Sequence, residues 1–432
     1  MTQPETFFDW TAIPFSITEL ADRRQRLMQQ IRGQGGGLFL APSQHHFSDG
    51  FTFRQLDDFY YFTGLELPNS VLAIDADRGE TRLFIPAEDP RFLSPGRPND
   101  FPSRPLLSDN LLSENSGIRS IEEIGSLPTY LANLESEGRS VWVNPGRVDD
   151  IKPAQSDYVQ AWSIIDSFLL HLQKEHSKLQ LKSAFKQIAR LRMIKSAAEI
   201  NIMRRACDIT MESIRETAAQ IRPGIREREM EGILEAGFKK RGAQRLPFAS
   251  IIKTGPNTLW PWRILASHYD RRDRAAQDGE LVVFDVGCEL DHYGSDMGRT
   301  FPVSGQFTAE QREILTFQLD VLDAMIDGMR PGVTLSEVQQ RGLDVMPDTA
   351  KPYMQIGHFF GHHIGLSPGD PSLPYAPLEA GMIITVEPWY YNHDREIGTF
   401  IEDVILVTES GYENLTRSLP RTAKGMAEMV RG

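Results

Sequence analysis

The hydrophobic pattern of roughly the first 178 residues alternates between helix and strand periods. Apolar residues at helical spacing predict a first helix, which the glycines at 35–37 would end: Leu20, Leu27, Met28 and Ile31. Short apolar runs predict strands at 38–40, 71–74, 82–85 and 141–143. Helical patterns lie between them, at 121–134 and 158–172. This alternation predicts an α/β domain with its own sheet.

A polar stretch at 176–178 predicts the end of that domain, which divides the chain into residues 1–178 and 179–432. The second segment opens with a basic amphipathic pattern at 181–193, which predicts a helix. The length of 432 residues also favours two or three domains over one core.

The second segment contains an internal repeat. A helical pattern that begins near Ile200 ends in Arg-Pro-Gly at 222–224, and a second one ends in the same tripeptide at 330–332. The second helix is predicted to begin at Thr308, whose side chain can form a capping box with Gln311. Another helix and then carboxylate-bearing strands follow in each case. The repeat predicts two related α/β halves that bring their carboxylates together at a shared centre.

Each of these carboxylates lies in or beside an apolar run: Asp285, Asp296, Glu387 and Glu402. Taken singly, each could be an exposed turn or strand-edge residue. Burying unpaired ionised carboxylates costs several kcal/mol each, so the group needs a counter-charge, and metal ions can supply it. The spacing of Asp285 and Asp296 predicts facing positions on an antiparallel hairpin.

One histidine in the glycine-rich stretch 361–365 is expected to join the carboxylates. Local chemistry does not decide between His362 and His363. Oxygen ligands with one imidazole suit divalent manganese, iron, cobalt or zinc.

Composition narrows the class of protein. Hydrophobic content of 40% and charged content of 24% are typical of a globular protein, and a net charge of −13 disfavours nucleic acid and anionic membranes as partners. No apolar run is long enough to span a membrane, and no signal peptide is visible at the N-terminus. Two cysteines make no disulfide framework, so we expect a cytoplasmic protein.

Several motifs resemble known families. The second segment is similar to the catalytic domain of Xaa-Pro aminopeptidases, prolidases and methionine aminopeptidases, which share the pita-bread fold. The likeness rests on the five candidate ligands in order and on the stretches 191–196, 199–200, 203–204 and 411–416. Through 53–55 and 57–64, the first segment resembles the N-terminal domain of aminopeptidase P. The expected fold is thus α/β (α+β), with a smaller α/β domain before a pita-bread domain of two pseudo-symmetric halves.

The resemblance implies a site for two divalent metal ions, usually manganese, cobalt or zinc. By it, Asp285 chelates one metal, Asp296 and Glu402 bridge both, and His362 and Glu387 complete the second.

Further positions match the family one by one. They imply a role beside the substrate for His268, His358 and Tyr391. Two positions depart from the pattern, because Gly369 stands where the family has a histidine and Phe400 where it commonly has an arginine. The stretch 257–266, with its two tryptophans, is either a wall of a substrate subsite or a packed surface loop.

The expected function is a metal-dependent hydrolase that releases the N-terminal residue from peptides with proline second, as an aminopeptidase or a dipeptidase. Glu387 would transfer the proton, and His268 or His358 would stabilise the developing oxyanion. Gly369 and Phe400 leave two alternatives: a diverged hydrolase of another C–N bond or small substrate, or a weakly active binding protein. The resemblance also implies a homo-oligomer, either a dimer or a tetramer.

Overall fold

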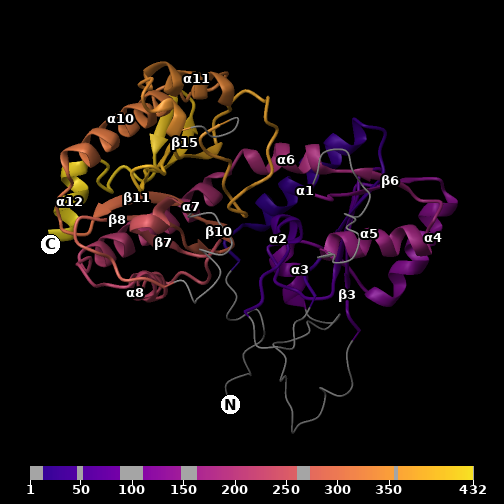
Figure 1. Ribbon diagram of the computed structural model, residues 1–432. Coiled ribbons are helices and arrows are strands. Elements are labelled where there is room, and N and C mark those ends of the chain that lie inside the picture. The colour runs from indigo at the N-terminus through magenta and orange to yellow at the C-terminus, as the bar shows by residue number, and fades with distance from the viewer. Residues whose placement is uncertain are drawn as a thin grey trace, which may run out of the picture. The chain divides into compact units, whose positions relative to one another are not determined.

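The computed structural model describes residues 13–45, 52–87, 110–146, 163–259, 273–354 and 359–431. Its contacts divide the chain into two compact units, Met1–Leu191 and Arg192–Gly432, here called unit 1 and unit 2 (Figure 1). Unit 1 therefore extends past residue 178, where the sequence places the boundary.

Unit 1 is built on a six-stranded mixed sheet with the order β4-β3-β2-β1-β5-β6. The three central strands β3, β2 and β1 are antiparallel, whereas β4, β5 and β6 join in parallel. Its elements are α1 (Ile17–Arg32), β1 (Leu38–Pro42), α2 (Asp57–Thr63), β2 (Val71–Asp75), β3 (Glu80–Ile85), α3 (Asn110–Ser116), β4 (Ser120–Glu123), η2 (Ile124–Ser126), α4 (Leu127–Ser136), β5 (Ser140–Val143), α5 (Ile164–Glu175) and β6 (Gln180–Ser183).

Both faces of this sheet are covered. On one face, α4 and α5 pack on alternate strand residues such as Leu38, Val141 and Val143. On the other face, Phe39 of β1 makes an edge-to-face contact with Phe62 of α2. Burial on both sides explains why the inner strands β1, β2 and β5 are nearly continuous apolar runs.

The helix and the strands predicted at 20–31, 38–40, 71–74, 82–85 and 141–143 are confirmed. Two helix predictions are wrong in part. Residues 120–123 form β4 before α4 begins, and residues 180–183 form β6 before α6 (Phe185–Met193). These segments are too short for periodicity to separate strand from helix, and pairing with β3 and β5 decides the outcome.

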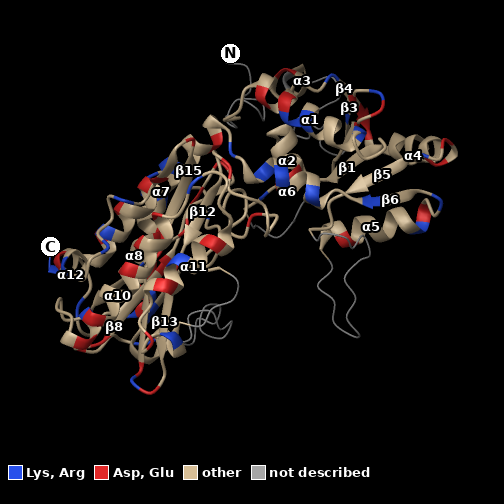
Figure 2. Ribbon diagram, turned by 90° about the horizontal axis from the view of Figure 1, so that it is seen from above, with Lys and Arg blue, Asp and Glu red and all other residues tan. Residues whose placement is uncertain are grey.

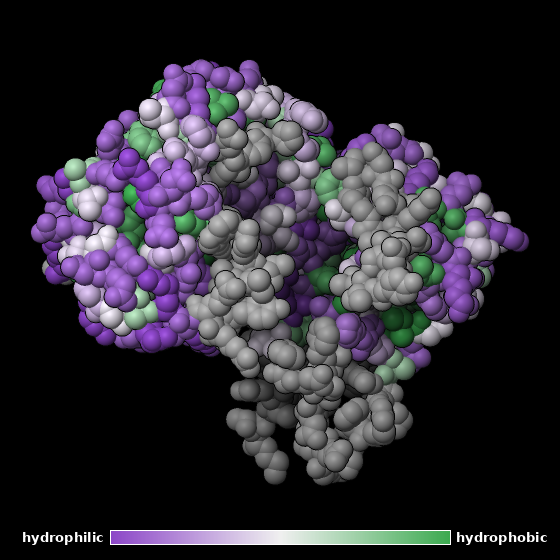
Figure 3. Space-filling view, viewed as in Figure 1, coloured by the Kyte–Doolittle hydropathy of each residue, from purple (hydrophilic) through white to green (hydrophobic). Residues whose placement is uncertain are grey.

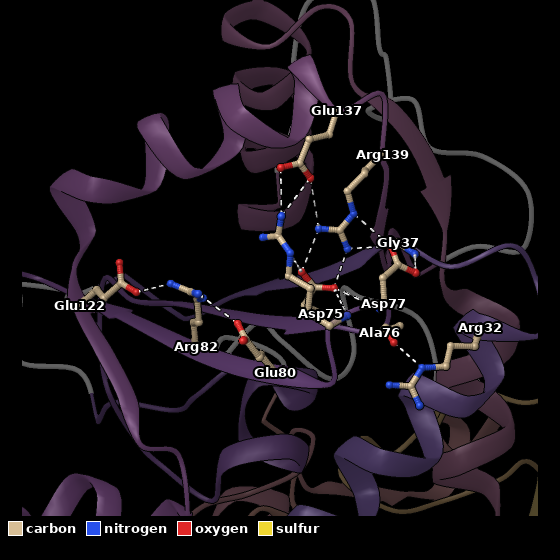
Figure 4. A network of polar contacts seen from close by, with 11 residues as sticks. Arg32, Gly37, Asp75, Ala76, Asp77, Glu80, Arg82, Glu122, Glu137 and Arg139 are labelled. Atoms are coloured by element: carbon tan, nitrogen blue, oxygen red, sulfur yellow. Dashed lines mark hydrogen bonds and ion pairs between the residues drawn. The ribbon is translucent and has the colours of Figure 1, made fainter.

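An ion-pair network lies at the β2–β3 turn of unit 1 (Figure 4). Arg139 donates to both oxygens of Asp75, at 2.9 and 2.5 Å, and also to Asp77, whose Oδ1 accepts from the Gly37 amide. Asp75 is buried, and burial alone would raise its pKa. Hydrogen bonds from the Arg139 side chain and the Arg78 amide outweigh burial and hold the pKa of Asp75 below its usual value. The network ties β5 to the turn between β2 and β3.

Unit 2 consists of two halves, each of which begins with two helices and continues with strands. The first half contains α7 (Ala197–Ala218), α8 (Glu227–Lys240), β7 (Ile251–Thr254), η3 (Gly255–Leu259), β8 (Leu281–Val286), β9 (Glu289–Leu290), β10 (Tyr293–Gly294) and β11 (Met297–Pro302). The second half contains α10 (Ala309–Ile326), α11 (Leu335–Val345), η4 (Lys351–Tyr353), β12 (Ile383–Val386), β13 (Trp389–Asn392), β14 (Ile397–Phe400), β15 (Asp403–Thr408) and β16 (Gly411–Asn414), and α12 (Ala423–Arg431) closes the chain.

The repeat seen in the sequence is present in the backbone. Gly224 and Gly332 both have left-handed φ angles, +89° and +86°, which favour glycine. Their amides donate to equivalent carbonyls, those of Ala276 and Leu378, each at 2.8 Å. The predicted capping box of Thr308 and Gln311 is also confirmed.

The two halves contribute separate three-stranded sheets, β11-β8-β7 and β12-β15-β16 (Figure 1). Gly298 of β11 and Glu402, just before β15, form an isolated antiparallel bridge between them. The Glu402 amide donates to the Gly298 carbonyl at 3.0 Å, and the Gly298 amide donates back at 3.4 Å. A side chain at Gly298 would collide with the Phe400 ring, so only glycine permits this approach.

Acidic and basic residues are interspersed in both units (Figure 2), and polar residues predominate on the face drawn in Figure 3. Within the described ranges, no helix combines the length and the apolar character needed to cross a membrane.

Replacing Arg139 with Met should destabilise unit 1 by about 2–4 kcal/mol, because it leaves the buried Asp75 carboxylate without its main partner. Amide hydrogen exchange in β1, β2 and β5 would measure the change. Arg26→Met, which removes an exposed pair with Asp22, should cost less than about 1 kcal/mol. Equal effects of the two substitutions would contradict this account of the network.

Candidate metal centre

Asp285 and Asp296 belong to the antiparallel pair β8–β11. Asp285 lies opposite Gly298, and Asp296 lies just before the first residue of β11. The two aspartates are therefore diagonal neighbours on one face of the pair, and the prediction that they face each other directly is wrong. The difference arises because the chain between them forms its own β9–β10 hairpin, whose turn residues Asp291 and His292 have φ angles of +48° and +69°.

Glu387 and Glu402 extend the antiparallel pair β12–β15. Val386 pairs with Asp403, so continuing this register by one residue brings Glu387 opposite Glu402. Glu402 is also the residue that bridges to Gly298. The carboxylates of both halves consequently meet where the two sheets join.

The segment that carries His362 runs beside β12, to which His363 forms an isolated antiparallel bridge at Ile384. The Thr385 amide donates to the His362 carbonyl at 2.9 Å, and the His362 amide donates to the Thr385 hydroxyl at 3.1 Å. Because side chains alternate along extended chain, His362 and His363 point to opposite sides. His363 is buried, which lowers its pKa to about 3.

His362 is the histidine that lies beside the carboxylates. Its Nε2 is 3.5 Å from Asp296 Oδ2 and 3.5 Å from Glu387 Oε1. Potential ligand atoms of Asp296, His362 and Glu402 all lie within 4.8 Å of one another. The four carboxylate residues are at most 8% exposed, whereas the His362 side chain is 35% exposed, so the histidine marks the accessible side.

Four of the buried carboxylate oxygens have no hydrogen-bond partner within the described part of the chain. They are Asp285 Oδ2, Asp296 Oδ1 and both oxygens of Glu402. No Lys or Arg of the described residues forms an ion pair with these side chains. Such groups are costly unless a cation compensates them, and the oxygen-rich set with one imidazole fits a divalent metal ion.

The pKa values of the four carboxyl groups in the metal-free site are raised, because the groups are buried close together. Burial, followed by the charge of Asp296, raises the pKa of Asp285 well above its usual value. Burial likewise raises the pKa of Asp296 to about 7 and that of Glu387 to about 8, and it raises the pKa of Glu402 strongly. A cation among these groups would favour their ionised forms.

The other predicted site residues are only partly described. Tyr391 lies on β13 and stacks on Trp389, with ring centroids 5.6 Å apart. His268 and His358 lie outside the described residues, as does the stretch from residue 260 to 266 with its tryptophans.

Phe400 and Gly369, the two departures from the family pattern, have contrasting surroundings. Phe400 is fully buried and stacks on Trp389 at 3.6 Å between ring centroids, with Val283 and Tyr391 packed beside it. An added Cβ on exposed Gly369 would meet no atom within 4 Å. The position of Phe400 is therefore part of an apolar core, whereas that of Gly369 has room for a side chain.

Sequence reasoning did not identify Arg299, a fully buried residue beside the bridge between the halves. Its donors reach the carbonyls of Gly298 and Glu402 and the carboxylate of Asp403. The sequence feature that could have identified it is a charged residue within the mostly apolar stretch 297–303.

Comparison with known proteins gives two family matches. The description "Metallopeptidase family M24" matches residues 201–409, and "Aminopeptidase P, N-terminal domain" matches residues 20–93. The Xaa-Pro aminopeptidase of Escherichia coli (strain K12) is 30% identical over 447 residues, covering 94% of this chain and 95% of the relative. The mitochondrial intermediate cleaving peptidase 55 of Arabidopsis thaliana is 27% identical, over 96% of this chain and 83% of the relative.

Solved structures give a concordant result. The structure of E. coli aminopeptidase P with the inhibitor Pro-Leu superposes with a TM-score of 0.78 at 26% sequence identity. It covers 96% of this chain and 98% of that one. The similarity thus extends over both units.

The metal-free protein should lose stability as pH rises from 6 to 8. In the unfolded chain Asp296 and Glu387 ionise near pH 4, whereas in the folded chain the pKa of Asp296 is about 7 and that of Glu387 about 8. The folded state therefore binds more protons than the unfolded state across this interval. Thermal unfolding in excess chelator should show a Tm lower by about 5 °C or more at pH 8. The Tm of the Glu387→Gln variant should depend less steeply on pH. A wild-type Tm that rises between pH 6 and 8 would contradict the raised pKa values of these carboxyl groups.

Proposed function

Because the chain belongs to metallopeptidase family M24, we propose that it releases the N-terminal residue from peptides with proline in the second position. The observation that carries the proposal is the convergence of four buried carboxylates and His362 where the two halves of unit 2 meet. The N-terminal match and the names of the relatives support the aminopeptidase form of this reaction.

We propose that the centre holds two divalent ions, manganese in preference to cobalt or zinc. Asp285 would bind one ion, His362 and Glu387 the other, and Asp296 and Glu402 would bridge them. The unpartnered oxygens of Asp285, Asp296 and Glu402 support this assignment. When bound, such ions lower the pKa of a water and polarise the scissile carbonyl.

The chain's own residues would supply the proton transfers. Glu387 Oε1 lies 3.5 Å from Nε2 of His362, whose side chain is 35% exposed. Its carboxylate would accept the proton of the attacking water and deliver it to the leaving nitrogen. Tyr391, His268 and His358 are proposed to contact the substrate, and one of the histidines to donate to the developing oxyanion.

A hydrolase of another C–N bond is the second candidate. Phe400 supports it, because the buried stack with Trp389 leaves no place for the arginine of the family pattern. Gly369 likewise offers no imidazole. We also propose a homo-oligomer, a dimer or tetramer, which light scattering at the monomer mass would exclude.

Replacing Glu402 with Ala should abolish most metal binding, because it removes the two unpartnered oxygens of one of the two proposed bridging ligands. After reconstitution with Mn²⁺, elemental analysis of the wild type should give about two ions per chain, as in dinuclear hydrolases. Glu409→Ala, an exposed glutamate in the turn after β15, serves as the control and should bind metal normally. Only trace metal in the wild type would overturn the proposed centre.

The Gly369→His variant should cleave Xaa-Pro peptides faster than the wild type. An imidazole there has room, and one oxyanion-type donor is worth on the order of 100- to 1000-fold in kcat. Gly411→His, at another open position, is the control and should leave kcat unchanged. Phe400→Arg should instead destabilise the protein, because it buries an unpaired guanidinium.

Kinetics with the manganese-loaded enzyme separates the two candidate functions. If the wild type cleaves Xaa-Pro peptides rapidly and Gly369→His only lowers the rate, other groups have taken over the role of the family's imidazole. If no variant cleaves Xaa-Pro peptides while another amide is hydrolysed, the second candidate takes the place of the first.

A further inference from the structure

Every N–H donor of the Arg299 guanidinium has a hydrogen-bond acceptor. Nη1 donates to the carbonyls of Gly298 and Glu402 at 2.7 and 2.5 Å. Nη2 donates to Asp403 Oδ1 at 2.7 Å and to the Leu419 carbonyl at 3.2 Å. Nε donates to the Pro420 carbonyl at 2.8 Å. All five N–H groups are therefore satisfied in a side chain with no exposed surface.

Two of these acceptors belong to the bridge between the halves of unit 2. Gly298 and Glu402 already exchange backbone hydrogen bonds, and Arg299 adds a charged donor to both carbonyls. Gly298 lies opposite Asp285 in the β8–β11 register, while Glu402 is itself a proposed ligand. The arginine thus contacts the backbone of both strands that carry proposed ligands from different halves.

The arginine acts from the opposite side of the strands. Side chains alternate along β11, so Arg299 points away from the face that bears Asp285 and Asp296. Asp403, next to Glu402, likewise points to the rear, where it also accepts from Thr416 at 2.9 Å and Asn414 at 2.7 Å. Among the described residues, this rear ion pair forms no hydrogen bond with a carboxylate of the proposed centre.

We propose that Arg299 is a positioning residue that sets the metal affinity of the centre by holding the two halves at a fixed distance. The inference rests on the proposed metal centre. Lys cannot replace the arginine, because an ammonium group has no planar fork with which to span carbonyls of two strands and a carboxylate. Substitutions behind metal ligands typically weaken metal binding 10- to 100-fold.

The test is isothermal titration of the metal-free full chain with Mn²⁺. Arg299→Lys should raise the Kd for Mn²⁺ by about 10- to 100-fold. It should also raise the Mn²⁺ concentration required for half-maximal peptidase activity, with the peptide KM unchanged once metal saturates. Arg23→Lys is the matched control, since Arg23 is equally buried in unit 1 and donates to the Tyr61 carbonyl at 2.9 Å. That variant should lower Tm without changing the Kd for Mn²⁺.

Different outcomes would refute the positioning role of Arg299 and the proposed metal centre. A folded Arg299→Lys protein that binds Mn²⁺ as tightly as the wild type would overturn the positioning role alone. A wild type that binds neither Mn²⁺, Co²⁺ nor Zn²⁺ would overturn the proposed centre together with this inference. If Arg299→Lys does not fold, Asp403→Asn keeps the side-chain volume and weakens the rear ion pair. Unchanged Mn²⁺ affinity in that variant would equally refute the role of Arg299.

Discussion

Four carboxylates are buried around His362 without an ion pair to Lys or Arg among the described residues, and unit 2 must compensate their charge. Without a cation they can remain buried only by keeping protons, as the raised pKa values of Asp296 and Glu387 indicate. In the proposed metal-bound form, the same oxygens would serve as ligands. The stability of unit 2 and its chemistry therefore depend on the same electrostatic constraint.

The halves of unit 2 contribute two of the four carboxylates each. Each half brings two carboxylates to the end of a strand pair, and the backbone bridge between Gly298 and Glu402 is one of the links between the pairs. The close approach needs a glycine on one side, and a buried arginine holds it from the rear. Small errors at this junction would displace ligands of both halves at once.

Phe400 departs from the family pattern, and the residues around it pack closely against its ring. Its ring fills space against Trp389 and covers Gly298, so the position contributes to packing beside the centre. Gly369 has no such compensation, because its surroundings are open. The two departures thus have different consequences: one is built into the core, and the other leaves space that a substrate or a side chain can occupy.

The sequence by itself determined the class of fold, the repeat and the candidate ligands, because buried strands, Arg-Pro-Gly breaks and carboxylates in apolar runs are local patterns. It did not decide between His362 and His363, whose local chemistry is the same, nor did it give the diagonal placement of Asp285 and Asp296. Strand pairing decided both, since register and alternation determine which side chains share a face. Pairing with β5 likewise made residues 180–183 a strand. The role of Arg299 depends on acceptors far apart in the chain, which only the tertiary structure brings within hydrogen-bond distance.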